Sequence, residues 1–166
     1  MAAQIAVNEL LFLMDNAFER SRAHSLLNNL SAVTEDDYAR EYAGRSIREM
    51  VRHLTAAKHV YDNQAFGDGS LFMPSFQDRI YGSSAGMAED LDWLHHGYET
   101  LRASVAALDD ADLAQPRPVH MGGTLETRAI ISIMIEHDVY HAGEINHLRA
   151  LMQGTDYWRG REPSKA

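Results

Sequence analysis

The sequence contains no cysteine, which excludes disulfide bonds, thiolate metal sites and a cysteine nucleophile. Any metal ion must therefore be held by histidine, aspartate or glutamate side chains. Only four prolines occur in 166 residues, so long stretches are free to form helices. The longest apolar run, residues 129–135, is interrupted by Ser132 and is far shorter than the roughly 20 residues that cross a bilayer. We expect a soluble protein without membrane association.

Positive charge is also scarce. The formal net charge is -9, and the basic residues are dispersed along the chain. A nucleic-acid interface normally requires a basic patch, so we expect no nucleic-acid partner. The N-terminal residues carry no basic stretch ahead of an apolar one, and Asn8 and Glu9 interrupt the apolar residues early. We therefore expect no secretion signal and a cytoplasmic protein.

Apolar residues recur at helical spacing in four stretches, which predicts an all-α four-helix bundle as a single domain over residues 1–166. Ser46-Ile47-Arg48-Glu49 has the form of a capping box and should begin the second helix, and Gly154 should end the fourth. The connection over residues 67–84 is long and contains aromatic residues, which suggests that it packs on the bundle. Trp158 is expected to pack against the bundle end. The expected helices cover residues 4–30, 46–66, 87–108 and 124–153.

Two histidines lie in the middle of the apolar stripe of the fourth helix. His137 and His141 are one turn apart, a spacing at which two imidazoles can bind one ion. The alternative is a pair of core histidines that hydrogen-bond to their neighbours. Two imidazoles and the carboxylate of Glu144 are costly to bury without partners, and a shared cation compensates all three, which favours a metal site.

A third ligand must come from another helix. His53 is the leading candidate, since it lies at the edge of the apolar stripe of the second helix. His95 borders the apolar seam of the third helix and is its competitor. His59 falls on the polar side of the second helix and is expected to be solvated.

The order of these parts resembles the DinB-like (YfiT-type) family of four-helix-bundle proteins. The resemblance is carried by the segments 44–54 (GRSIREMVRHL) and 137–145 (HDVYHAGEI). In that family one histidine of the second helix and an H-x-x-x-H pair of the last helix bind a divalent metal. By position these ligands are His53, His137 and His141. Glu144 stands where many relatives have glutamine, so it could be a fourth ligand or could hold a ligating imidazole.

Two other metal-site patterns fit less well. A zincin protease needs H-E-x-x-H, but Asp138 occupies the place of the glutamate. A ferritin-like di-iron site needs two E-x-x-H motifs, and only Glu144 with His147 supplies one, while Asp92 with His95 imitates the second. Both patterns are therefore less favoured than a three-histidine site.

Three histidines leave coordination positions open, as in catalytic metal sites. The resemblance implies a metal-dependent transferase or hydrolase that acts on a small molecule, with a low-molecular-weight thiol as one substrate class. The alternative is a non-catalytic bundle that is stabilised by metal or senses it, and that acts as a homodimer or with a protein partner. Imidazole ligands suit a divalent transition metal, with zinc or nickel first and iron as a further option.

Overall fold

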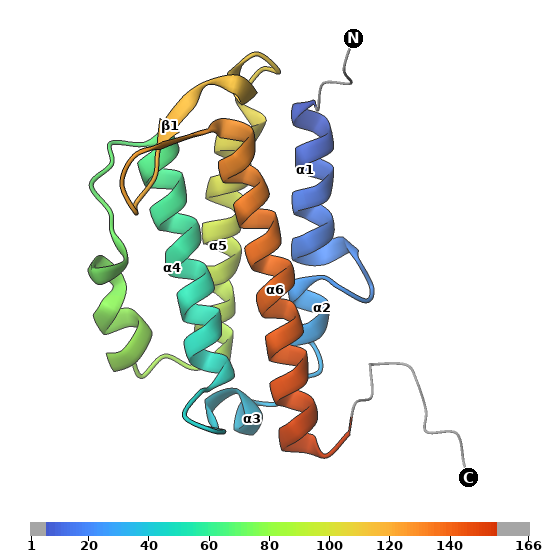
Figure 1. Cartoon of the computed structure of the whole chain (residues 1–166). Coiled ribbons are helices and arrows are strands. Elements are labelled where there is room, and N and C mark those ends of the chain that lie inside the picture. The colour runs from blue at the N-terminus through green and yellow to red at the C-terminus, as the bar shows by residue number, and fades with distance from the viewer. Residues whose placement is uncertain (1–5, 156–166) are drawn as a thin grey trace.

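The computed structural model describes residues 6–155, in which four long helices lie side by side (Figure 1). The helix α4 packs against α5 and α6, and α1 packs against the same two helices. This confirms the predicted all-α bundle. Trp158 lies outside the described residues. The bounds are α1 Val7–Asp15, η1 Asn16–Arg20, α2 Leu26–Leu30, α3 Glu35–Ala39, α4 Ile47–Phe66, η2 Met73–Phe76, η3 Asp78–Gly82, α5 Met87–Ala106, η4 Asp112–Ala114, β1 Pro116–Pro118, β2 Thr124–Glu126 and α6 Thr127–Gln153.

The first helical stretch is shorter than predicted. The sequence favours one helix over residues 4–30, but α1 ends at Asp15 and continues as one π-helical turn, η1. The backbone becomes extended at Ser21, and Ser25 caps the new helix α2 by accepting a hydrogen bond from the Asn28 N–H at 3.3 Å. Serine competes for backbone hydrogen bonds, which explains why the apolar period does not hold the helix together here.

The predicted boundaries of the second and fourth helices are close to those observed. The Ser46 hydroxyl accepts a hydrogen bond from the Glu49 N–H at 3.2 Å and begins α4 as expected. Gly154 ends α6 in the left-handed conformation, with φ of 66°. The helix α5 ends at Ala106, two residues before the predicted end.

A hairpin precedes α6 where the sequence indicates only a polar link. The strands β1 and β2 pair antiparallel, with Arg117 opposite Leu125. Gly122 and Gly123 both have positive φ in the turn, a conformation that glycine adopts without strain. The hairpin delays α6, which begins at Thr127 and not near Thr124 as predicted.

Residues 67–86 form a strap along the outer side of α4, drawn in green in Figure 1. The strap packs on the bundle, as predicted, and Arg52 of α4 fastens its second half. The buried Arg52 guanidinium donates hydrogen bonds to the carbonyl oxygens of Ile80, Ser83 and Ala85, at 3.2, 3.0 and 2.9 Å. Its Nε donates to Asp90 of α5 at 2.7 Å. One side chain of α4 thus fixes both the strap and the neighbouring helix.

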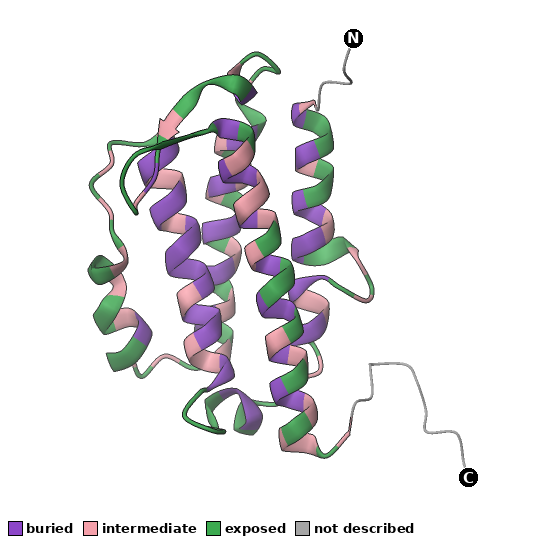
Figure 2. Ribbon diagram, in the orientation of Figure 1, coloured by how far each residue is buried: buried purple, intermediate pink, exposed green. Residues whose placement is uncertain are grey.

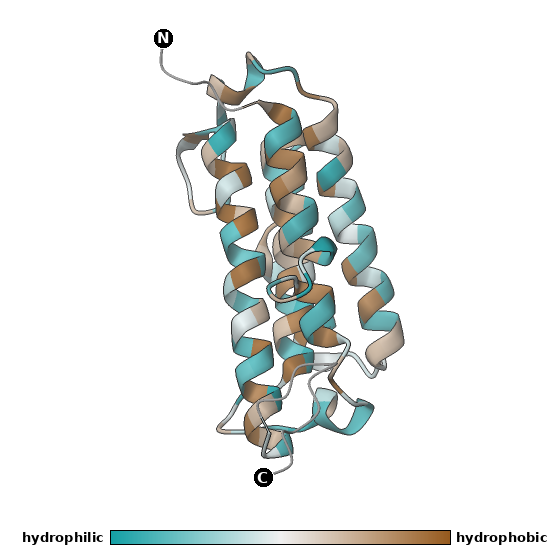
Figure 3. Cartoon of the chain, turned by 90° about the vertical axis from the view of Figure 1, so that its right-hand side faces the viewer, coloured by the Kyte–Doolittle hydropathy of each residue, from teal (hydrophilic) through white to brown (hydrophobic). Residues whose placement is uncertain are grey.

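The apolar core lies between the long helices, whose facing sides are buried (Figure 2). From the side, apolar and polar residues alternate along each helix (Figure 3), as expected for an amphipathic bundle. None of the helices within residues 6–155 has the length and apolar character needed to cross a membrane. The following core side chains are at most 1% exposed: Leu10, Phe18, Leu26, Ile47, Leu54, Leu94 and Ile130.

A buried ion pair joins α4 to α6 within this core. The Lys58 ammonium lies 2.5 and 2.6 Å from the two carboxylate oxygens of Asp138, and the two side chains are 1% and 5% exposed. The ammonium also lies 5.5 Å from the centre of the Phe18 ring. Since either charge alone would be costly to bury, each requires the other.

A second polar contact joins α1 to α5. Asp15 accepts hydrogen bonds from the Tyr98 hydroxyl at 2.5 Å and from the Arg102 guanidinium at 2.7 and 3.1 Å. The hydrogen bonds from Arg102 and Tyr98 outweigh burial and hold the pKa of the Asp15 carboxyl below its ordinary value of 3.8. The ionised form of Asp15 is therefore the one that stabilises the fold.

We expect Lys58→Met to lower the free energy of unfolding by about 3–5 kcal/mol, because it leaves the Asp138 charge buried without a partner. The double variant Lys58→Met with Asp138→Leu should lose much less, since neither charge remains. Urea unfolding measures both values. Arg128→Gln, in an exposed pair with Glu126, is the control and should cost less than about 1 kcal/mol. Equal losses in the single and double variants would contradict this account of the pair.

We expect Asp15→Asn to lower the free energy of unfolding at pH 7 by about 1.5–3 kcal/mol, the range for hydrogen bonds to charged groups. Because the folded pKa is lowered, the contribution of Asp15 is present above pH 3.8 and is lost as pH falls through the folded pKa. The variant should therefore lose less stability than the wild type between pH 5 and pH 2. Thermal unfolding over this range tests the difference, with the exposed Asp92→Asn as control. Parallel pH profiles for wild type and Asp15→Asn would refute it.

Candidate metal centre

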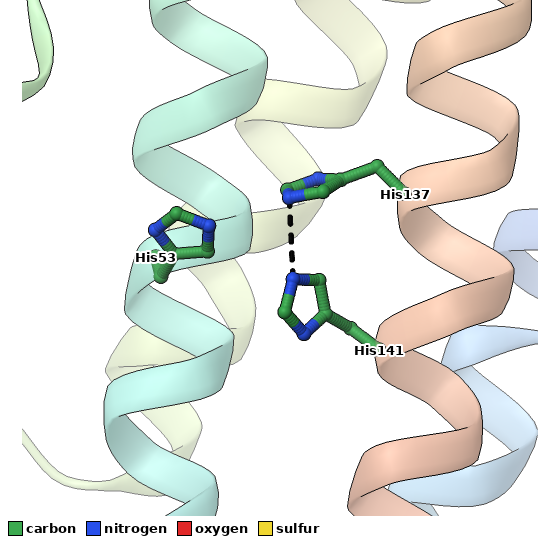
Figure 4. Close-up of side chains that lie close together, drawn as sticks. All are labelled: His53, His137 and His141. Carbon is green, nitrogen blue, oxygen red and sulfur yellow. Dashed lines mark hydrogen bonds between the residues drawn. The ribbon is translucent and has the colours of Figure 1, made fainter.

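Three histidine side chains meet between α4 and α6. His53 extends from α4, and His137 and His141 extend from α6, so that the three rings face one another (Figure 4). One nitrogen of each ring lies within 4.8 Å of the others. The two Nε2 atoms of His137 and His141 are 3.2 Å apart, and the His53 ring centre lies 5.3 and 5.4 Å from theirs. The structure thus brings together the three residues that the sequence singles out as ligands.

Helix geometry explains this convergence. His137 and His141 are four residues apart, which places both rings on one side of α6. The Lys58–Asp138 ion pair holds α4 against α6 close to the site, since Asp138 follows His137 and Lys58 lies about one and a half turns after His53.

Burial keeps the three imidazoles neutral. His141 is 8% exposed, and the other two rings are half-buried. Burial, together with the neighbouring histidines, lowers the pKa of His137 to about 3. Burial also lowers the pKa of His53 and of His141, although Glu144 opposes the shift at His141. Neutral rings present nitrogen lone pairs, which is the form that binds a metal ion.

Glu144 contacts the outer side of His141. Its Oε2 atom lies 2.6 Å from His141 Nδ1, while its Oε1 atom accepts a hydrogen bond from Arg45 at 2.8 Å. Burial raises the pKa of the Glu144 carboxyl, but Arg45 and His141 outweigh it, so the pKa lies below its ordinary value. Of the two roles considered for Glu144, this geometry corresponds to holding an imidazole, because the carboxylate contacts the nitrogen that faces away from His137 Nε2.

A pocket of about 410 Å³ opens beside the cluster. His53 and His141 form part of its wall, and the remainder includes Arg45, Glu49 and Tyr81. Sequence reasoning did not assign these three a role in the site. The sequence singles out Glu49 only as part of the capping-box pattern, and Arg45 only as part of the segment that resembles the family. Tyr81 belongs to the strap, where no periodicity indicates which way a side chain faces.

The other histidines lie away from the cluster. His95, the competitor of His53, packs edge-on against Phe18, with ring centres 5.4 Å apart. His59 was expected to be solvated, but it is half-buried and packs against both Phe76 and Trp93, because the strap covers this side of α4. His147 is exposed on α6 and cannot complete a di-iron motif with Glu144 inside the bundle. Asp138, in the place of a zincin base, is bound to Lys58.

A family model described as the DinB superfamily matches residues 17–145. The chain belongs to the DinB superfamily. The matched range covers most of the chain and includes His53, His137 and His141. No curated protein matches the chain. DinB superfamily proteins are generally metal-binding, and the close group of three histidines is compatible with that property.

We expect the His137 imidazole to stay neutral at pH 5.5 in the metal-free protein, because burial holds its pKa well below 6.5. Long-range ¹H–¹⁵N NMR spectra distinguish neutral from protonated imidazoles. The control is the urea-unfolded chain at the same pH, in which the ring should be mostly protonated. A folded-state titration of His137 centred near pH 6.5 would be incompatible with the buried cluster.

Proposed function

We propose that this DinB superfamily protein is a metal-dependent enzyme, a transferase or hydrolase acting on a small molecule. In this proposal His53, His137 and His141 bind one divalent transition metal ion, with zinc or nickel first and iron next. The observation that carries the proposal is the convergence of three neutral imidazoles beside a pocket.

The residues fit such an ion in type and in spacing. Two ligand nitrogens bound to one tetrahedral ion at roughly 2.0–2.1 Å lie about 3.3 Å apart, close to the 3.2 Å between His137 and His141.

Three protein ligands leave room for a substrate atom in the coordination sphere, and the pocket gives access to it. A metal ion held there supplies Lewis acidity. The chain itself supplies position: Glu144 contacts His141 Nδ1 and fixes that ring, and Arg45 in turn holds Glu144.

A low-molecular-weight thiol is the substrate class that we propose for this site. Sulfur is a ligand that zinc accepts readily, and the chain, which lacks cysteine, offers no sulfur ligand of that kind itself. A thiol that enters the pocket would thus bring the ligand type that the protein does not provide.

Elemental analysis by plasma mass spectrometry tests the metal site. We expect about one transition metal ion per chain in the purified protein, and loss of most of it in the His137→Ala, His141→Ala double variant and in His53→Ala. His59→Ala and His147→Ala are matched controls, since these histidines lie on the same two helices but outside the cluster, and both should keep the metal.

A metal-free wild type that remains folded, and that takes up no zinc, nickel or iron on dialysis, would overturn the proposal. Metal retained by His53→Ala at the wild-type level would remove His53 from the ligand set. To test catalysis, metal-loaded protein is then assayed with small thiols and electrophilic co-substrates, with the double variant as the blank.

The second candidate is a non-catalytic bundle that metal stabilises or switches, acting as a homodimer. Exposed apolar side chains on α1 and α6 favour it: Phe12, Val139 and Tyr140 are 56%, 44% and 63% exposed. Sedimentation of the metal-loaded and metal-free protein separates the candidates. A metal-dependent change in mass without any reaction of thiols would support this second function.

A further inference from the structure

The pocket beside the histidine cluster carries two side chains of opposite charge. Arg45 lies in the turn before α4, and Glu49 lies in its first turn. Glu49 is four residues before His53, so both residues point to the same side of α4. A ligand that reaches the histidines from this pocket therefore passes a cation and an anion.

Glu49 offers an unused acceptor. Its backbone N–H is capped by Ser46, but its carboxylate has no hydrogen bond or ion pair within residues 6–155. The side chain is half-buried among pocket residues that include the buried Met50. A partly desolvated carboxylate gains most from a positively charged donor, such as an ammonium group.

Arg45 retains donors beyond its pair with Glu144. Only its Nη1 atom contacts Glu144, at 2.8 Å, and its side chain is 58% exposed. A guanidinium has five N–H donors in a planar fork, so a second carboxylate can be bound while Glu144 stays in place. Glu144 also contacts His141, so its negative charge is divided between two partners. Arg45 therefore remains available to a further anion.

Tyr81 contributes to the pocket wall from the strap, a different segment from the one that carries Arg45 and Glu49. It is 70% exposed and belongs to the η3 turn of the strap. The neighbouring Ile80 carbonyl is bound by Arg52, the residue before His53 in α4. An exposed aromatic ring on a fastened segment is a preformed surface for one face of a ligand.

We propose that the pocket selects small ligands that carry both a carboxylate, bound by Arg45, and an ammonium group, bound by Glu49, with Tyr81 packing over them. The inference rests on the proposed metal-dependent function, because it assigns the ligand class of that same site. A pocket of about 410 Å³ is of the size that small-molecule sites have.

Three thiol probes test the selection on the cobalt(II)-loaded protein: L-cysteine carries both charged groups, 3-mercaptopropionate lacks the amine, and cysteamine lacks the carboxylate. The near-ultraviolet charge-transfer absorption of a cobalt–thiolate bond reports binding without any turnover. We expect L-cysteine to bind at least about tenfold more tightly than either analogue, because each analogue loses one charge-assisted contact.

Matched variants distinguish recognition of the probe by the pocket side chains from simple chelation of the metal by the probe. Glu49→Gln should remove most of the preference for L-cysteine over 3-mercaptopropionate, and Arg45→Gln most of the preference over cysteamine. Each comparison is a ratio within one variant, so a change in cobalt affinity cancels. Tyr81→Ala should weaken all three probes, and Glu136→Gln, exposed on α6 outside the pocket, should change nothing.

Failure of the proposed metal function and failure of the proposed ligand selection give different results. If the protein does not bind cobalt, the proposed metal function fails and this inference falls with it. If cobalt binds but no thiol binds, or if the preference for L-cysteine is the same in wild type, Glu49→Gln and Arg45→Gln, the selection is overturned while the metal site stands.

Discussion

The Lys58–Asp138 ion pair is the contact on which the arrangement of the site depends. It joins α4 to α6, the two helices that supply all three clustered histidines. Apolar packing alone tolerates small shifts between helices, whereas a buried pair with two short contacts requires one register. His137 directly precedes Asp138, and His53 lies five residues before Lys58, so the convergence of the histidines follows from the pairing as much as from their own spacing.

The histidines of α6 could be predicted because a helix converts sequence spacing directly into geometry. His137 and His141 are neighbours on any helix, whatever surrounds it. The contribution of His53 was harder to predict, since no periodicity links residues of different helices. The residue pattern left His95 as a competitor, and the family resemblance favoured His53. In the structure His53 lies in the cluster and His95 does not, because His95 packs against Phe18.

The surroundings of the cluster could not be predicted in the same way. Arg45 and Tyr81 reach the pocket from a turn and from the strap, where no helical period applies. Glu49 lies one turn before His53 on α4, so its spacing from that histidine was the one available signal. The strap also explains the error at His59, since a helix that looks half-polar by period can be covered by a connection. The interrupted first helix and the hairpin before α6 have similar causes, namely serine caps and glycine turns that act over a few residues.

The fastening of the strap by Arg52 has a consequence for cooperativity. A connection without such contacts opens locally, at little free-energy cost, while the rest of a protein stays folded. Here the segment near Tyr81 is bound by a fully buried side chain of α4. Releasing the segment exposes the Arg52 guanidinium, breaks its hydrogen bonds to the strap carbonyls and separates Asp90 from Arg79. The wall of the pocket and the helix of His53 therefore belong to one cooperative unit. A ligand that binds in the pocket stabilises that whole unit by mass action, and its binding is reflected in the unfolding of the entire bundle.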